Sequence, residues 1–130
     1  MNANNKAKIE PDFNRASSLW HEGKLLEAAR IFKGLDKKFP NQPAILGMLG
    51  AIYFTTGNYA NALTYWEKVV KLSPKSELAS RALFHTLLQH ERFDDALTEA
   101  NRFIKLNGYS KEYAMIMEEL DENGAFNRPR

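Results

Sequence analysis

The feature that most constrains this chain is an internal repeat of 34 residues, visible when the sequence is aligned with itself at that offset. The columns that align are Leu19, Tyr53 and Leu87; Trp20, Phe54 and Leu88; Leu25, Tyr59 and Phe93; Ala28, Ala62 and Ala96; Phe32, Trp66 and Ala100; and Leu35, Val69 and Phe103. A fixed period of this length is typical of repeat arrays, in which each unit buries its apolar face against its neighbours. The sequence therefore predicts three stacked units rather than one irregular core.

Within each unit the apolar residues have a helical spacing. In the second unit, residues 46–53 and then residues 59–70 each place apolar side chains on one face at about 3.6 residues per turn. Gly57 and Asn58 lie between the two stretches, where glycine suits a helix end and asparagine suits the start of the next helix. Pro74 then ends the second stretch. Each unit is expected to be helix, tight turn, helix and stop.

These motifs resemble the tetratricopeptide repeat, whose pattern is W-x2-L-G-x2-Y, then A-x3-F, then P. The second unit reads Leu46-x2-Leu49-Gly50-x2-Tyr53, then Ala62-x3-Trp66, then Pro74. The first unit matches in part, through Ala28-x3-Phe32 and Pro40. The third departs from the pattern at Ser80, at Phe84, where the family has a small residue, and at Glu91, which replaces the turn glycine. We expect wider helix spacing in the third unit.

The resemblance implies an all-α, right-handed α-solenoid of three helix-turn-helix units with a seventh, capping helix. The expected helices cover about residues 10–22, 25–38, 43–56, 59–72, 77–90, 93–106 and 111–122. The repeats themselves cover about 10–42, 43–76 and 77–110. We expect one domain over residues 10–122, flanked by mobile segments at 1–9 and 123–130.

Composition excludes several other classes of protein. At 44% hydrophobic and 26% charged residues, the chain can bury a core. Its formal charge of +2 lacks the basic excess of a dedicated nucleic-acid binder, and it has no cysteine for disulfides or thiolate metal sites. It also has no apolar run long enough to span a bilayer and no apolar stretch near the start that would indicate a secretory signal. We expect a cytoplasmic protein without membrane contact.

Catalytic patterns are absent as well. Gly47 and Gly50 lie within one helix and form no phosphate-binding loop. His85 and His90 are five residues apart, which places them on different helix faces, and His21 lies far away in the sequence. We therefore expect no enzymatic activity, no catalytic or metal-binding residues and no cofactor.

The family resemblance also implies where a partner would bind, because the first helix of each unit lines a concave groove. The implied groove residues are Phe13, Ser17, Trp20, His21, Met48, Ala51, Phe54, Arg81, His85, Leu88 and Met115, with Glu119 also contributed by the seventh helix. Trp20, Phe54 and Leu88 would form an apolar ladder along this groove if they stay partly open rather than joining the core.

The best-known groove chemistry of the family is a clamp of Lys, Asn and Arg that grips the carboxylate of a chaperone tail. The corresponding positions here are Phe13, Ser17, Met48, Leu78 and Ala82, none of which is basic. The leading hypothesis is therefore a non-enzymatic scaffold or adaptor that holds a protein or peptide with apolar anchors, rather than a chaperone tail.

Two alternatives stay open. Residues 1–40 carry a net charge of +3 and residues 77–130 a net charge of −3, which would suit head-to-tail contact between copies in a self-assembling homo-oligomer. A small secretion-type chaperone is the other alternative, because such chaperones also use three repeats of this kind.

Overall fold

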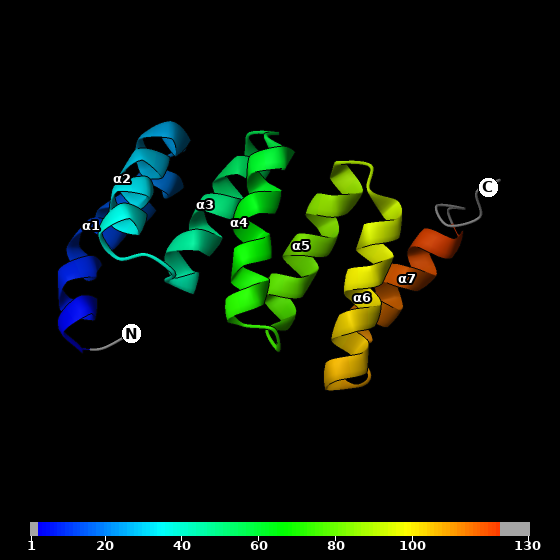
Figure 1. Ribbon diagram of the computed structural model, residues 1–130. Coiled ribbons are helices and arrows are strands. Elements are labelled where there is room, and N and C mark those ends of the chain that lie inside the picture. Colours follow the sequence, from blue (N-terminus) through cyan, green and yellow to red (C-terminus); the bar gives the residue numbers. More distant parts are fainter. Residues whose placement is uncertain (1–2, 123–130) are drawn as a thin grey trace.

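The computed structural model describes residues 3–122, and these residues form seven α-helices with no strand among them. The helices are α1 (Ala3–His21), α2 (Leu25–Lys38), α3 (Pro43–Thr55), α4 (Tyr59–Leu72), α5 (Glu77–Gln89), α6 (Phe93–Asn107) and α7 (Lys111–Glu122). They follow one another as antiparallel pairs along a single row, with α1 and α7 at opposite ends (Figure 1). The predicted all-α solenoid is confirmed, and the six later helices have the predicted bounds to within one residue.

The predicted start of the first helix is wrong. We expected the first helix to begin at about residue 10, after a mobile segment at 1–9, but α1 begins at Ala3 and runs through Pro11. Ile9 explains the extension, because it is only 4% exposed and packs with Ala28 and Phe32 in one of two core clusters. Because a single buried residue in a polar stretch creates no periodic pattern, this extension could not be predicted from the sequence. The predicted tail at 123–130 lies outside the described residues.

The alanine column lies in the core of each helix pair. Ala28, Ala62 and Ala96 are all fully buried. A larger side chain at such a position costs about 1–3 kcal/mol, because the surrounding helices have no room to absorb it. The repeat register predicted from sequence is confirmed at this column.

Two further aligned positions, one on each helix of a unit, show how the units accommodate side chains of different size. In the second unit the bulky Trp66 of α4 lies against Gly50 of α3, where an added Cβ would stand only 2.7 Å from Trp66 Nε1. In the third unit the sizes are exchanged, since Phe84 of α5 is fully buried and Ala100 stands at the position of Trp66. We expected wider helix spacing to make room for Phe84. The small side chain of Ala100, at the position of Trp66, provides room for it instead.

All three intra-unit turns share one geometry. Gly23, Gly57 and Glu91 have φ values of 81°, 81° and 60°. The next residue in each turn donates its backbone N–H to a carbonyl five positions back, as Asn58 does to Tyr53 at 2.8 Å. This is the Schellman end of a helix, which favours glycine. Glu91 therefore occupies a left-handed conformation that costs a residue with a Cβ about 1–2 kcal/mol.

Candidate functional site

The central feature of the site is a cavity of about 310 Å³ between α3 and α5. We call it the apolar cavity, and its lining consists of Ala51, Phe54, Thr55, Trp66, Ala82, His85 and Thr86. All of these residues except Trp66, which comes from α4, belong to the first helices of the second and third units. The cavity is therefore a joint product of two repeats.

Local packing explains why this cavity is open and apolar. Gly47 and Gly50 let the indole of Trp66 lie directly against α3, with the ring 3.5 Å from where a Cβ of Gly47 would be. The hydroxyls of Thr55 and Thr86 donate to carbonyls one turn back in their own helices, at 2.9 Å and 2.7 Å. Because those hydroxyls are already satisfied, the two threonines add little polarity to the lining.

His85 is the titratable member of the lining. Burial lowers the pKa of its imidazole, and the nearby Arg81 guanidinium lowers that pKa further. Its ring meets Phe84 edge to face, with 5.5 Å between the ring centroids. The imidazole is therefore neutral at pH 7, which suits an apolar ligand better than an imidazolium would.

A second cavity, of about 450 Å³, opens between α5 and α7. We call it the acidic cavity, and its lining consists of Arg81, Glu112, Met115, Ile116, Glu118, Glu119 and Glu122. Among residues 3–122, none of its four glutamates forms a hydrogen bond or ion pair with another side chain. Since Arg81 lies one helical turn from His85, the two cavities adjoin along α5, and together we call them the groove.

The two cavities gather only part of the predicted site. Ala51, Phe54 and His85 meet in the apolar cavity, whereas Arg81 and Met115 meet in the acidic one. The predicted residues of α1 line neither cavity. Among these, Ser17 and Trp20 are half-buried, His21 is exposed, and Phe13 packs edge to face on the buried Phe32 at 5.2 Å.

The three residues of the predicted ladder each keep part of their surface exposed. Trp20, Phe54 and Leu88 are all half-buried and pack against the core clusters. Met48 is also half-buried, and it packs against the core cluster that contains Ala28 and Phe32. Each rung thus keeps an open surface, as a ladder along the groove requires, but only Phe54 also lines the apolar cavity. Its part in binding stays a prediction.

Sequence reasoning missed Trp66, Thr86 and three glutamates of α7 as groove residues. Trp66 is only 7% exposed, yet its edge reaches the apolar cavity. The usable signal was the pair of glycines three residues apart in α3, which left one face of that helix bare. From the sequence alone, Glu112, Glu118 and Glu122 are predicted to form the solvated face of a capping helix.

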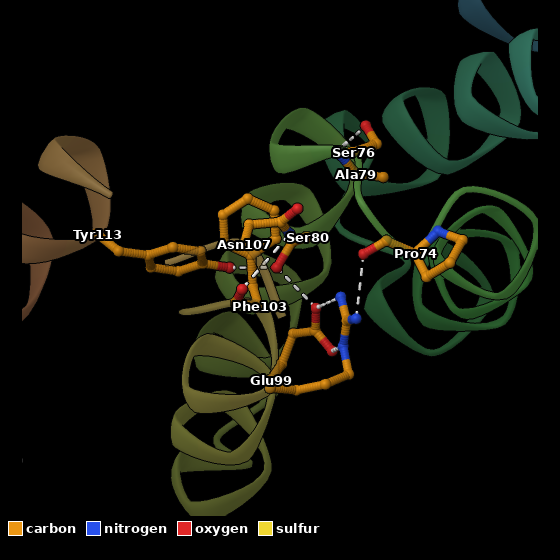
Figure 2. A network of polar contacts seen from close by, with 9 residues as sticks. Pro74, Ser76, Ala79, Ser80, Glu99, Phe103, Asn107 and Tyr113 are labelled. Atoms are coloured by element: carbon orange, nitrogen blue, oxygen red, sulfur yellow. Dashed lines mark hydrogen bonds and ion pairs between the residues drawn. The ribbon is translucent and has the colours of Figure 1, made fainter. Parts of the chain in front are cut away.

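A buried polar network holds α7 in place and so positions the acidic cavity (Figure 2). Ser80 Oγ donates to Glu99 Oε2 at 2.6 Å and lies 2.6 Å from the hydroxyl of Tyr113, so that α5, α6 and α7 meet at one point. Arg102 donates two hydrogen bonds to Glu99, at 2.8 Å and 2.7 Å, and a third to the Pro74 carbonyl. Burial raises the pKa of Tyr113 to about 12.

Over residues 3–122, no three histidine, aspartate or glutamate side chains converge in a way that could hold a metal ion. Over the same residues, none of the seven helices has both the length and the apolar character needed to cross a bilayer.

Comparison with known proteins gives three findings. The model of the tetratricopeptide repeat family matches residues 43–76. Anaphase-promoting complex subunit 3 of Schizosaccharomyces pombe is 30% identical over 115 residues, which cover 88% of this chain but only 17% of that protein. This chain therefore spans about a sixth of the length of that relative.

Solved structures with the same fold cover the chain almost completely. The first tetratricopeptide domain of Spaghetti (RPAP3), bound to the HSP90 peptide SRMEEVD, superposes with a TM-score of 0.78 at 16% identity, over 92% of this chain and 95% of that one. The Yersinia enterocolitica type III secretion chaperone SycD, in complex with a peptide of the translocator YopD, gives a TM-score of 0.74 at 17% identity, over 93% and 92%.

Proposed function

Since this chain belongs to the tetratricopeptide repeat family, we propose that it is a non-enzymatic interaction scaffold that holds an apolar segment of a partner protein in the groove. The observation that carries the proposal is the apolar cavity, which presents Phe54 and the edge of Trp66 beside a neutral His85. Its volume of about 310 Å³ suits one large apolar side chain better than a folded surface. We also propose a cytoplasmic location.

Similar structures support a peptide as the ligand. Spaghetti and SycD, which share this fold, were both solved with a bound peptide. The peptide on Spaghetti is acidic at its end, whereas the clamp positions that would grip such an end here are Phe13, Ser17, Met48, Leu78 and Ala82. The partner of this chain is therefore proposed to be anchored by apolar side chains rather than by a terminal carboxylate.

The test is selection of peptides from a random displayed library on the purified chain, followed by titration of the selected sequences. We expect enrichment of peptides with a large apolar residue, and we expect Phe54→Ala to weaken them by about 2 kcal/mol, the loss typical of a central anchor contact. Leu106→Ala is the control, because Leu106 is an exposed apolar residue on α6 that lies outside both cavities. Equal losses in the two variants, or selection of peptides without apolar anchors, would refute the proposal.

A secretion chaperone is the second candidate, favoured by the end-to-end match with SycD over 93% of this chain and 92% of that one. A scaffold and a chaperone differ in their effect on the partner. A chaperone would keep a separately insoluble client in solution when co-expressed with it, and Phe54→Ala would lose that effect. A scaffold would bind a partner that is already soluble by itself.

A further inference from the structure

The apolar cavity contains two hydrogen-bonding groups that have no partner among residues 3–122, the indole N–H of Trp66 and the imidazole of His85. We propose that this cavity is a subsite for a tyrosine side chain of the bound segment, whose phenol oxygen lies between these two groups. The inference rests on the proposed function, because it assumes that the groove holds a peptide. It narrows the large apolar anchor of that peptide to one type of residue.

The indole N–H of Trp66 carries most of the argument. The side chain is only 7% exposed, yet over residues 3–122 no group accepts a hydrogen bond from its Nε1. A buried N–H without an acceptor is uncommon, because it loses its bond to water and gains none in return. Between residues 3 and 122, Arg81 Nε is the one fully enclosed side-chain nitrogen or oxygen without a hydrogen bond. Trp66 Nε1 therefore keeps some open surface, which a ligand oxygen in the cavity can reach.

His85 supplies a complementary group at the same height of the groove. Trp66 Nε1 lies beside Gly50 of α3. The position equivalent to Gly50 in the next repeat is Phe84, the direct neighbour of His85 on α5, and equivalent positions of stacked repeats lie side by side. Because burial and the Arg81 charge lower the pKa of His85, its ring is neutral and offers one N–H donor and one acceptor nitrogen.

The walls around these two groups suit an aromatic ring. Ala51 of α3 and Ala82 of α5 contribute only methyl groups, which leaves width between the two helices, and Phe54 adds an aromatic surface. The hydroxyls of Thr55 and Thr86 already donate to carbonyls of their own helices. The two threonines therefore do not need a hydrogen-bond acceptor from the ligand.

Tyrosine is the residue that meets both requirements of the cavity. Its phenol oxygen can accept from the indole N–H while its hydroxyl donates to the acceptor nitrogen of the imidazole. Phenylalanine fills the same space but leaves both groups unpaired. Serine or threonine would leave most of the cavity of about 310 Å³ empty. A carboxylate would lose its hydration among apolar walls and would face a neutral ring rather than a cation.

The experiment takes a peptide selected on the purified chain and resynthesises it with its large anchor replaced in turn by tyrosine, phenylalanine and para-methylphenylalanine. Para-methylphenylalanine has nearly the length of tyrosine without its hydroxyl, so it separates hydrogen bonding from size. We expect the tyrosine peptide to bind about fivefold more tightly than either of the others, which is typical of one net hydrogen bond. Equal affinity of the tyrosine and para-methylphenylalanine peptides would overturn the proposal.

Nuclear magnetic resonance of the isotopically labelled chain gives a direct second readout. The two tryptophans, Trp20 and Trp66, give two indole N–H resonances, and the one that is lost in Trp66→Phe belongs to Trp66. The tyrosine peptide should shift that resonance downfield and slow its exchange with water, whereas the para-methylphenylalanine peptide should not. A resonance that responds equally to both peptides would refute the hydrogen bond, even if the tyrosine peptide binds more tightly.

Variants then assign the preference for tyrosine to the cavity. His85→Leu and Trp66→Phe should each reduce that preference to about twofold or less, because each removes one of the two partners of the hydroxyl. Trp66→Phe installs the residue that the family pattern has at this position, and His85→Leu tests the subsite independently of the core. The matched control is His90→Leu, an exposed histidine at the end of α5 outside both cavities, which should keep the full preference.

The outcomes separate this inference from the proposed function. If the three peptides bind equally but all lose affinity in Phe54→Ala, the tyrosine subsite is refuted and the apolar groove stands. If His90→Leu reduces the preference as much as His85→Leu, the preference arises outside the cavity and the subsite is again refuted. If none of the three peptides binds, both the groove and its subsite are wrong.

Discussion

The second and third repeats solve the same packing problem with opposite choices of side chain. The second repeat puts its bulk on its second helix, as Trp66, and clears the first helix with Gly50. The third puts its bulk on its first helix, as Phe84, and has the small Ala100 on the second. The register of the solenoid thus fixes where volume must lie, but not which helix supplies it.

The two repeats also differ in how each first helix begins. Leu46 is buried among apolar residues in the second repeat, whereas Ser80 takes its place in the third and is bonded to Glu99 and Tyr113. The last repeat has only the single helix α7 beyond it, and hydrogen bonds hold that helix in one position where apolar contact alone permits sliding. The third repeat therefore uses directional hydrogen bonds from Ser80 to fix α7, whereas the second repeat, which packs against a complete helix pair, relies on apolar burial at the same position.

The largest expected effect comes from giving the second repeat the side-chain sizes of the third, with a phenylalanine at position 50 and an alanine at position 66. Gly50→Phe should clash with Trp66 and Trp66→Ala should leave a void, each costing about 3 kcal/mol or more of unfolding free energy. The double variant should recover at least about 2 kcal/mol of the summed loss, because phenylalanine fills the space that tryptophan vacates. Urea denaturation of all four proteins measures this coupling, and additive losses would show that the exchange of sizes is not a true compensation.

The next largest effect concerns the polar network of the third repeat. Arg102→Ala should cost about 2–3 kcal/mol, because Glu99 is only 7% exposed and would lose its charged partner. Lys68→Ala is the matched control, since Lys68 holds the corresponding, exposed position in the second repeat. Thermal melts of both variants check the comparison, and it fails if the two lose similar stability.

The buried polar network also predicts how the stability of the chain changes at alkaline pH. Because burial raises the pKa of Tyr113 to about 12 from an ordinary value near 10, the folded state favours the neutral phenol. This contribution to stability is present below about pH 10 and is lost as the pH rises toward 12. Burial also raises the pKa of Tyr65, so ultraviolet titration should show more than one late-ionising tyrosine, and the latest of them should disappear in Tyr113→Phe. A titration unchanged by that substitution would place the late group elsewhere.

A smaller effect of opposite sign is expected at the turns. Glu91→Gly should stabilise the chain by about 1 kcal/mol, whereas Gly57→Ala should destabilise it by a similar amount, because both residues have positive φ. The midpoints of thermal unfolding should then shift by a few degrees in opposite directions. Shifts of the same sign would mean that the side chain of Glu91 makes a compensating contact.

The smallest effect concerns pH and binding, and it compares the two repeats that form the apolar cavity. Ala51 of the second repeat stays apolar at every pH, whereas His85 of the third gains a charge once the pH falls below its lowered pKa. Affinity for an apolar peptide should therefore be constant near pH 7 and fall a few-fold only as the pH drops below the ordinary histidine pKa of 6.5. Calorimetric titration of the His85→Gln variant should show no such pH dependence, and an equal fall in affinity in that variant would refute the assignment to His85.

Much of the architecture could be read from particular residues. The column of Ala28, Ala62 and Ala96 located a fully buried position in each repeat, and Gly57 with Pro74 bounded the helices of the middle repeat. The site was less predictable. Positions implied by the family included Phe54 and His85, which line the apolar cavity, but also Phe13, which the structure packs against Phe32.

The sequence by itself determined the repeat period, the number of helices and the residues of each core column, because helical periodicity and steric limits act locally and recur every 34 residues. Only the tertiary structure decided that Trp66 reaches the groove, that Ser80 and Tyr113 meet, and that the glutamates of α7 face Arg81 across a cavity. These features depend on how neighbouring units are rotated and spaced. That geometry arises from the packing of whole side chains between repeats, which no local pattern records.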